Sequence, residues 1–202
     1  MTLTLNGNTN TISGLAVGGL PDGIVDTDML ANNAVTVAKA AGSVQGITEM
    51  DQWRLTTNTD VVGGASTDLT SNWERSDTAF SKIGTGMTES SGIFTFPSTG
   101  IWQIDFTGYT TDTDHNRYTG IMVKYSSNGG SSYSELSYNL DSIHDNGSDT
   151  VYGSYRSQGM LDVTSASDFR VKFTIQAHSN SVLGGNTSYT RTGATFIRLG
   201  DT

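Results

Sequence analysis

The segment SGIFTFPSTGIWQIDFTGYTT, residues 91–111, contains two strand patterns and the turn between them. Pro97 lacks a backbone N–H donor and ends a short run of β-branched and aromatic residues. After the turn, Trp102, Ile104 and Phe106 alternate with polar residues. A period of two is typical of a half-buried strand, so we predict a long strand here, at the centre of one antiparallel domain.

The chain after residue 60 repeats this kind of pattern. Asn128-Gly129-Gly130 is a hairpin turn signal between two of the candidate strands. The candidate strands are residues 78–83, 92–96, 101–110, 118–125, 132–138, 150–163, 169–178 and 193–199. Their spacing predicts an all-β fold, a β-sandwich or barrel.

Three of these strands differ in how many of their faces are apolar. In DFRVKFTIQAH every second residue from Phe169 to Ala177 is apolar, which predicts one wet face. GATFIRLG is apolar on both faces, with Ala194 and Phe196 on one and Ile197 and Leu199 on the other. The 118–125 strand also places Met122 opposite Ile121 and Val123. Because an antiparallel strand that is apolar on both faces needs a second cover, we expect another subunit to supply it.

Composition limits the class of protein. The chain has 202 residues, no Cys and a formal net charge of −9, with only 11 Lys and Arg scattered singly. The absence of Cys excludes disulfides and thiolate metal sites, and the absence of a basic stripe argues against nucleic acid as a partner. Neither a secretory signal nor a run long enough to span a bilayer is recognisable, so we expect synthesis in a cytosol.

The first quarter of the chain differs from the rest, because no aromatic residue precedes Trp53. Aromatic residues supply much of the area that cores bury. We therefore predict that residues 1–59 are a docking and trimerisation arm and that residues 60–202 are the head.

Two elements are expected in the arm. LTLNGNTNTI predicts a small hairpin about Asn6-Gly7-Asn8. Asp26 or Thr27 as N-cap, followed by apolar residues at helical spacing up to Gly42, predicts a short helix.

The arm also carries a resemblance. ISGLAVGGLPDGIVDTDMLANNAVTVAKA resembles the linker segments of bacteriophage tail-fibre and other virion appendage proteins, over residues 3–41. Pieces like NNAVTVAKA repeat in those proteins, and one copy is found here. The resemblance implies a short collar or docking segment that contacts other virion proteins.

Residues 73–110 resemble the globular head of the C1q-like family, which is related to the tumour-necrosis-factor-like jelly roll. The matching residues are Gly92, Phe94, Pro97, Gly100, Trp102, Ile104 and Phe106. The resemblance extends over about residues 60–202. It implies a ten-stranded jelly-roll β-sandwich that assembles as a homotrimer about a three-fold axis.

Catalytic and metal-binding patterns are weak. His115, His144 and His178 have no triad or metal spacing and are interpreted as surface or loop residues. The segment from Asp112 to Asn116 opens like a calcium loop, but its sixth and twelfth positions lack the required Gly and Glu. We predict no enzyme activity, no cofactor and no metal site. A looser calcium site, suggested by calcium binding in some C1q-like heads, stays open as an alternative for Asp112, Asp114, Asp145 or Asp149.

Aromatic residues are the candidates for ligand contact. The alternation around Trp102 favours a core position over a sugar-stacking one. The better candidates are the loop aromatics Tyr109, Tyr118, Tyr138 and Tyr152, since tyrosine offers a ring face and a hydroxyl. Asn146-Gly147-Ser148 and Asn186-Thr187-Ser188 match the glycosylation pattern but carry no weight without a secretory signal.

These observations favour a non-enzymatic structural protein located in a bacteriophage virion. The head would be either a fibre or knob that contacts a host surface glycan, or a capsid decoration protein that clamps the shell. The alternative is a bacterial C1q-like lectin or adhesin that binds surface glycans, and a hydrolase on the same fold ranks third.

Overall fold

The computed structural model describes residues 4–6, 11–13, 46–112, 116–144, 147 and 149–202. The chain divides into two units, Met1–Val44 and Gln45–Thr202. In the first unit, β1 (Thr4–Asn6) pairs antiparallel with β2 (Thr11–Ser13), which confirms the expected hairpin. The residues of its turn and the predicted helix lie outside the described residues.

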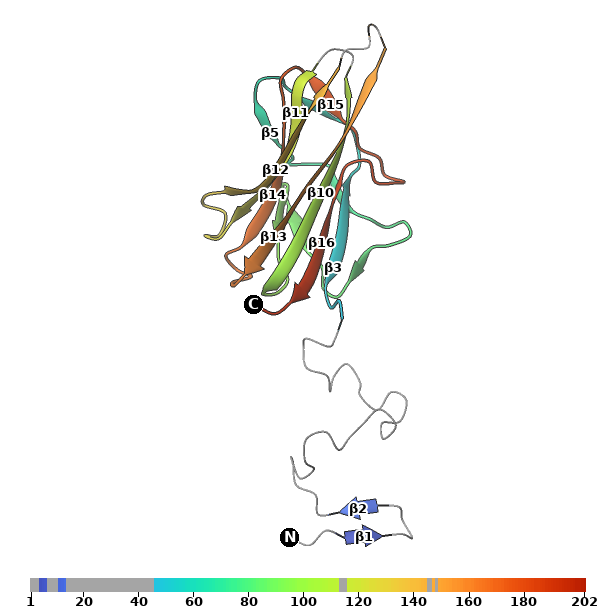
Figure 1. Ribbon diagram of the computed structural model, residues 1–202, viewed down its shortest axis with the longest axis vertical. Helices are drawn as coiled ribbons and strands as arrows, with labels where there is room; N and C mark the ends of the chain where they lie inside the picture. Colours follow the sequence, from blue (N-terminus) through green and yellow to red (C-terminus); the bar gives the residue numbers. More distant parts are fainter. Residues whose placement is uncertain (1–3, 7–10, 14–45, 113–115, 145–146, 148) are drawn as a thin grey trace. The chain divides into compact units, whose positions relative to one another are not determined.

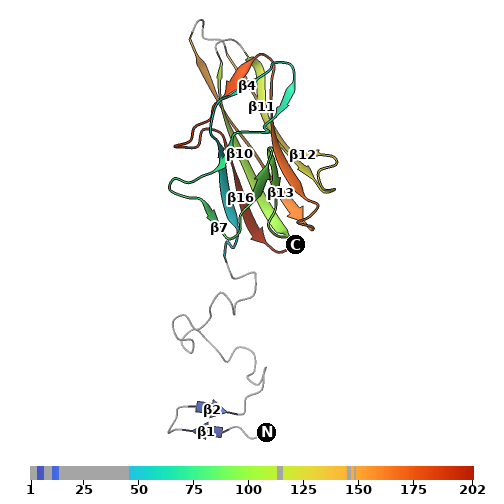
Figure 2. The same cartoon turned by 180° about the vertical axis from the view of Figure 1, so that it is seen from behind.

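One sheet of the second unit is organised around β10 (Gly100–Asp112), the long strand expected from the 91–111 segment. The whole length of β10 pairs with β13 (Val151–Val163), and its other edge pairs with β16 (Gly193–Gly200) and β15 (Ser181–Leu183). Figures 1 and 2 show these strands side by side. The remaining strands of this β10 sheet are β3 (Met50–Leu55), β4 (Thr59–Val61), β6 (Trp73–Arg75) and β7 (Lys82–Ile83).

The second sheet is organised around β14 (Arg170–Ala177), and all its pairs are antiparallel. Its other strands are β5 (Ser66–Asp68), β8 (Thr88–Ser90), β9 (Ile93–Thr95), β11 (Asn116–Ser126) and β12 (Ser134–Ile143). The order is β12-β11-β14-β9-β8, with β5 added beside β14. The β11–β12 hairpin turns where it was predicted, and Gly129 and Gly130 supply the positive φ angles there.

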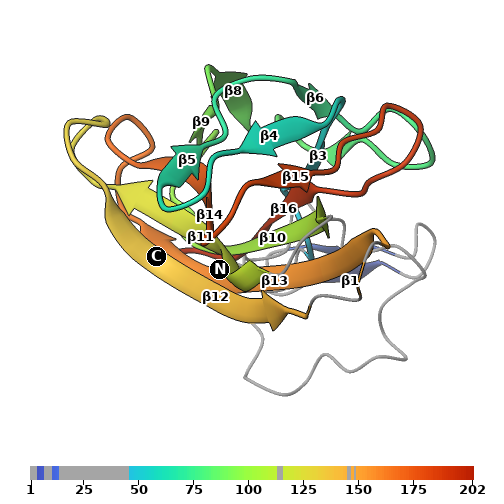
Figure 3. The ribbon, with the colours of Figure 1, turned by 90° about the horizontal axis from the view of Figure 1, so that it is seen from above.

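The two sheets pack face to face, and the chain passes repeatedly from one to the other (Figure 3). Such crossings occur from β9 to β10, β10 to β11, β12 to β13, β13 to β14 and β14 to β15. This connectivity of two antiparallel sheets is that of a jelly-roll β-sandwich. The predicted all-β fold class is confirmed. Within the described residues no helix is long and apolar enough to cross a membrane.

Aromatic rings from both sheets form the centre of the core. The ring of Phe173 on β14 lies 4.5 Å from that of Phe106 on β10 and 5.4 Å from that of Phe94 on β9. The ring of Trp73 on β6 lies 5.5 Å from Phe173, and that of Phe196 on β16 lies 6.0 Å away. Phe94, Phe106, Phe173 and Phe196 have no exposed surface, so the cluster joins the sheets through a dry centre. Trp102 is also in the core, as predicted, with 1% of its surface exposed.

The head begins earlier than the predicted boundary at residue 60. β3 pairs with β16 through five consecutive residues, and Trp53 and Leu55 lie in the core. The strand was missed because Asp51 and Arg54 interrupt its apolar pattern although both are buried. The Asp51 carboxylate accepts hydrogen bonds from Trp53 Nε1 (2.9 Å), Met87 N (2.7 Å) and the Arg75 guanidinium (2.9 and 3.0 Å). A buried charge with this many partners fits inside a strand, and a hydropathy pattern does not reveal it.

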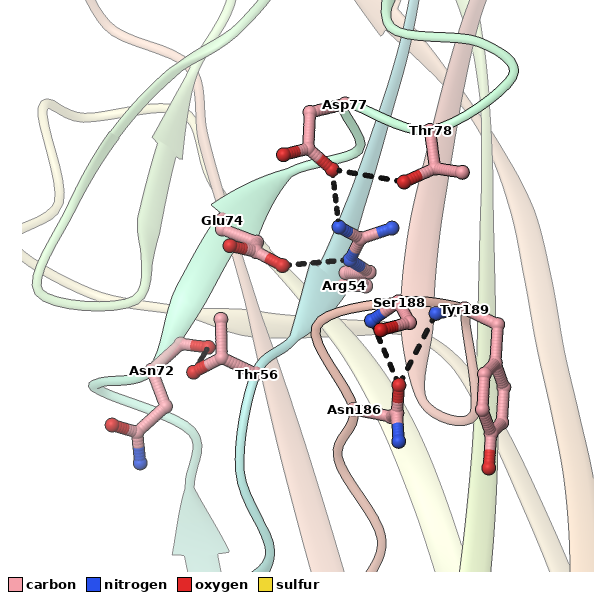
Figure 4. Close-up of polar contacts among 9 residues, drawn as sticks. All are labelled: Arg54, Thr56, Asn72, Glu74, Asp77, Thr78, Asn186, Ser188 and Tyr189. Atoms are coloured by element: carbon pink, nitrogen blue, oxygen red, sulfur yellow. Dashed lines mark hydrogen bonds and ion pairs between the residues drawn. The ribbon is translucent and has the colours of Figure 1, made fainter.

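Arg54 faces away from the core and is held by acidic residues from the following segment (Figure 4). Its Nε donates to Glu74 at 2.7 Å and its Nη2 to Asp77 at 2.5 Å. These ion pairs tie β3 to β6 and to the loop after β6. In that loop the predicted 78–83 strand is reduced to β7, because Ala79 adopts a left-handed φ of 68° that a strand does not allow.

The expectation for strands that are apolar on both faces holds in part. Met122 is outside the core cluster, yet only 2% of its surface is exposed within the single chain. It therefore needs no cover from another subunit, contrary to the expectation. Leu199 is 50% exposed and Ile197 is partly exposed, so the outward face of β16 does remain open in the described chain.

Phe173→Ala should lower the free energy of unfolding by about 4 kcal/mol, because it removes the ring at which the cluster from both sheets meets and leaves a cavity. Urea titration followed by tryptophan fluorescence measures this change. Tyr189→Ala, at a position that is 52% exposed, serves as the control and should change little. A loss of less than about 1 kcal/mol for Phe173→Ala would contradict the central role of the cluster.

Candidate functional site

Polar residues are buried at the end of the sandwich where β10 ends and β11 begins. Asp112, the last residue of β10, is 4% exposed, and Asn116 is fully buried. Asn116 Nδ2 donates to Asp112 Oδ1 at 3.4 Å and to the Ser179 carbonyl at 3.2 Å. Asn116 Oδ1 accepts from the backbone N–H groups of His178 and Ser179 at 3.1 and 3.2 Å. Asn116 thus fixes the start of β11 to the turn after β14.

Two buried oxygens at this end, Asp112 Oδ2 and the Ser181 hydroxyl, have no hydrogen-bond partner in the described chain. The Tyr155 hydroxyl interacts with the hydroxyls of Thr110 and Thr119. Burial raises the pKa of the Asp112 carboxyl above its ordinary value, against the weaker opposing effect of the Asn116 hydrogen bond. This end of the core is therefore held less firmly than the aromatic centre.

Two grooves flank this buried polar group. One, of about 660 Å³, lies between the end of β12 and the start of β13 and is lined in part by Asp141, His144 and Tyr152. The other, of about 520 Å³, lies beside the end of β10 and is lined in part by Asp60 and Asp112. The first groove is lined mainly by polar side chains and suits a small polar molecule. The second combines the carboxylates of Asp60 and Asp112 with three valines and is more apolar.

The candidate calcium residues are placed as follows. Asp112 is buried at the end of β10 beside Asn116, and Asp149 is exposed. Asp114 and Asp145 lie outside the described residues. Across the described ranges no three His, Asp or Glu side chains gather closely enough to hold a metal ion.

The histidines are placed at the ends of different strands. His178 follows β14, where its Nδ1 is 3.2 Å from Ser179 Oγ and its ring meets Tyr118 edge-on at 5.5 Å. His144 follows β12 and is exposed, and His115 lies outside the described residues. The contacts of His178 are those of a surface side chain.

The structure separates the four candidate tyrosines into two groups. Tyr109 on β10 and Tyr152 on β13 stack with centroids 6.0 Å apart, on the face of the β10 sheet that points away from the core. The Arg191 guanidinium lies over the rings of Tyr109 (5.3 Å) and Tyr189 (5.5 Å) and donates to the Tyr189 hydroxyl at 3.0 Å. Tyr189 and Arg191 were not predicted, because nothing in their polar loop sequence shows that it folds beside Tyr109.

The second group lies on the outward face of the β14 sheet. Tyr138 on β12 is 44% exposed, and its hydroxyl donates to Gln176 Oε1 at 3.2 Å. Tyr118 on β11 is partly exposed and contacts His178. Gln176 was not singled out in the sequence, where it is one of several polar residues on the wet face of β14.

Asn186, in one of the two glycosylation patterns, uses its side chain inside a turn. Its Oδ1 accepts from the backbone N–H groups of Ser188 at 2.8 Å and Tyr189 at 3.2 Å (Figure 4). Asparagine side chains commonly close turns in this way. Asn146 and Ser148 of the other pattern lie outside the described residues.

No family model and no curated protein sequence matches this chain. Among solved structures, it is similar to Eiger TNF from S. frugiperda, with a TM-score of 0.51 and 10% identity over 76% of this chain and 93% of that one. It is also similar to murine APRIL. The APRIL structure at pH 8.0 has a TM-score of 0.53 and 15% identity, and the match covers 75% of this chain and 98% of that one. The APRIL structure at pH 8.5 has a TM-score of 0.50 and 16% identity, and the match covers 74% of this chain and 99% of that one. At these identities the likeness concerns the fold, and it confirms the expected C1q/TNF-like jelly roll.

Asp112→Asn should stabilise the head at neutral pH. Because burial raises the pKa of Asp112 in the folded state, its stability contribution is fully present below the ordinary value of 3.8 and is lost as pH rises through the raised value. The amide has no charge to bury, so the variant should have a higher Tm at about pH 7 and an unchanged Tm at about pH 3.

Thermal unfolding followed by circular dichroism measures both values, with Asp149→Asn at an exposed position as the matched control. A lower Tm for Asp112→Asn at neutral pH would show instead that the head needs the charged carboxylate, and would contradict the expected stabilisation by removal of the buried charge.

Proposed function

We propose that this protein is a non-enzymatic structural protein of a bacteriophage virion, in which an N-terminal arm docks onto the particle and the jelly-roll head is displayed as a homotrimer. The observation that carries the proposed trimer is an apolar row on the outward face of the β10 sheet. The row consists of the apolar residues Met160, Ile197, Met50 and Ile83, with one polar residue, Gln103, between Met160 and Ile197.

The register of the sheet brings this row together from distant parts of the chain. Met160 pairs with Gln103, Gln103 with Ile197, Ile197 with Met50, and Met50 with Ile83. Met160 is 59% exposed and Ile83 is 41% exposed, and Leu199 on β16 is 50% exposed beside them. Exposed apolar side chains gathered in this way on one sheet face are typical of an interaction surface.

A second copy of the chain is a suitable cover for this face. Asp105 and Arg156 lie on it and form an ion pair at 2.5 Å, so these two charges offset each other. The Tyr109–Tyr152 stack extends the face beyond the polar pair, and tyrosine is enriched at protein interfaces. A trimer is the assembly that the C1q-like resemblance implies.

The role in a virion rests on the likeness of residues 3–41 to phage appendage linkers. A trimer repeated around a particle would achieve useful avidity from weak individual contacts. Either version of the role, a fibre knob or a capsid decoration protein, uses the same arm for docking. The boundary of the head at Gln45 assigns residues 1–44 to that arm.

Met160→Glu should convert the trimer into monomers at micromolar concentration, because three carboxylates would be buried at the interface without partners. Val62→Glu is the matched control, since Val62 is 63% exposed and lies outside the apolar row. Light scattering coupled to size-exclusion chromatography gives the mass of the full-length protein and of both variants. A monomeric or dimeric wild-type protein would contradict the proposed trimer.

The virion role has a separate test in particles of the virus that encodes this chain. Full-length protein should rebind particles from which it has been stripped, and a version lacking residues 1–44 should not. Equal rebinding of both versions would show that the arm is not the docking segment, and rebinding of neither would contradict the virion role.

A further inference from the structure

We propose that Tyr138 and its surroundings on the outward face of the β14 sheet form a carbohydrate subsite, in which the ring of Tyr138 stacks on the apolar face of a pyranose. The proposal begins with the hydrogen bond from the Tyr138 hydroxyl to Gln176 Oε1. Tyr138 is on β12 and Gln176 is on β14, and β11 lies between these two strands.

Strand spacing fixes the orientation of the ring. Neighbouring strands lie about 4.8 Å apart, so the side chain must cross the whole width of β11 to reach Gln176. Tyr138 pairs with Met122, whereas Gln176 pairs with Gly120, so the ring passes diagonally from one position to the other. A tyrosine that spans this distance lies flat along the sheet instead of standing upright from it.

Gly120 provides the space for this orientation. A Cβ atom there would lie 2.7 Å from the Asn139 carbonyl oxygen, 2.8 Å from Cε2 of Tyr138 and 2.9 Å from Cδ1 of Leu140, which is closer than real Cβ atoms approach. The glycine is within β11, in ordinary strand backbone, so it is needed for space and not for an unusual φ angle. The ring therefore lies against the β11 backbone at Gly120.

The resulting surface is rigid and open. The Tyr138 side chain is anchored on β12 at one end and on β14 at the other, so little side-chain entropy remains to be lost on binding. Tyr138 is 44% exposed and Leu140 is 48% exposed, and they form one small apolar platform over Gly120.

Polar groups border this platform and suit the hydroxyls of a sugar. The Gln176 amide lies at one end of the ring, and its nitrogen is a hydrogen-bond donor. Tyr118 and His178, in edge-on contact at 5.5 Å, are neighbours on the same sheet face. One apolar face with polar groups at its edge is the arrangement that recognises a pyranose, whose C–H groups and hydroxyls point in different directions.

The size of the platform favours a sugar over a protein partner. Of the exposed large apolar side chains in the described ranges, only Tyr138 and Leu140 belong to strands of the β14 sheet. A stable protein interface buries about 800 Å² on each partner, which two side chains do not provide. The platform is on the sheet opposite the apolar row, so it stays accessible in the proposed trimer, and this last step alone rests on the proposed function.

Saturation-transfer NMR tests the subsite with full-length protein and the methyl glycosides of glucose, galactose, mannose and N-acetylglucosamine as probes. At least one glycoside should receive saturation on its ring protons with a Kd of the order of 1–10 mM, as expected for a single stacking contact. Tyr138→Ala should reduce the signal at least fivefold. Tyr138→Phe, which keeps the ring and loses the tether to Gln176, should weaken binding by a smaller factor.

Tyr189→Ala is the matched control, because Tyr189 is 52% exposed and lies in the loop between β15 and β16. Gly120→Ala should displace the ring and the Asn139 backbone and so reduce the signal. Absence of saturation transfer to all four glycosides, an unchanged signal for Tyr138→Ala, or an equal loss for Tyr189→Ala would overturn the proposal. The mass measurement is independent, so a trimer that fails to bind and a monomer that binds are distinguishable results.

Discussion

The contact between Phe173 and Phe106 is the constraint on which the rest of the structure depends. Their rings come from the central strands of opposite sheets and lie 4.5 Å apart, within a cluster that has no exposed phenylalanine. A shift of one residue in the register of either strand would turn its aromatic residues outward and its polar residues inward. The cluster therefore fixes which residues of each long strand face solvent, and so determines both outward surfaces of the sandwich.

Those two outward surfaces differ in a way that separates assembly from recognition. On the β10 sheet the register aligns apolar residues from β13, β16, β3 and β7 into one row, with Gln103 of β10 between them, and this row is extensive enough to favour a broad contact. On the β14 sheet polar residues surround a single tyrosine platform, which is too small for such a contact. A head that self-associates through one sheet can present the other sheet three times, and weak sites gain avidity in this way.

The long strands could be predicted from the sequence, because the alternation of apolar and polar residues in β10 and β14 directly indicates which face is buried. The strand β3 could not be predicted in this way, because its buried Asp51 and Arg54 are paired with residues far along the chain. A local sequence pattern does not show such partners. The same limit applies to the surfaces. Tyr138 was recognised as a candidate, but its flat orientation depends on Gly120 and Gln176 in other strands, and only strand pairing brings these three residues together.

The two ends of the core differ in how strongly they are held, and this difference bears on where the protein tolerates change. The aromatic centre is dry and closely packed, whereas at the other end burial raises the pKa of the Asp112 carboxyl, and Asp112 Oδ2 and the Ser181 hydroxyl have no partner in the described chain. Unsatisfied polar groups lower local stability, so opening of the sandwich should begin at the Asp112 end and leave the ring cluster intact. Tyr138 is anchored on β12 and β14. Phe173 on β14 belongs to the buried ring cluster, and Leu136 on β12 packs against the hydrophobic core. The Tyr138 ring is therefore anchored through the firmly held part of the sheet, whereas Tyr118 and His178 at its border adjoin the end near Asp112, because Asn116 accepts the His178 N–H.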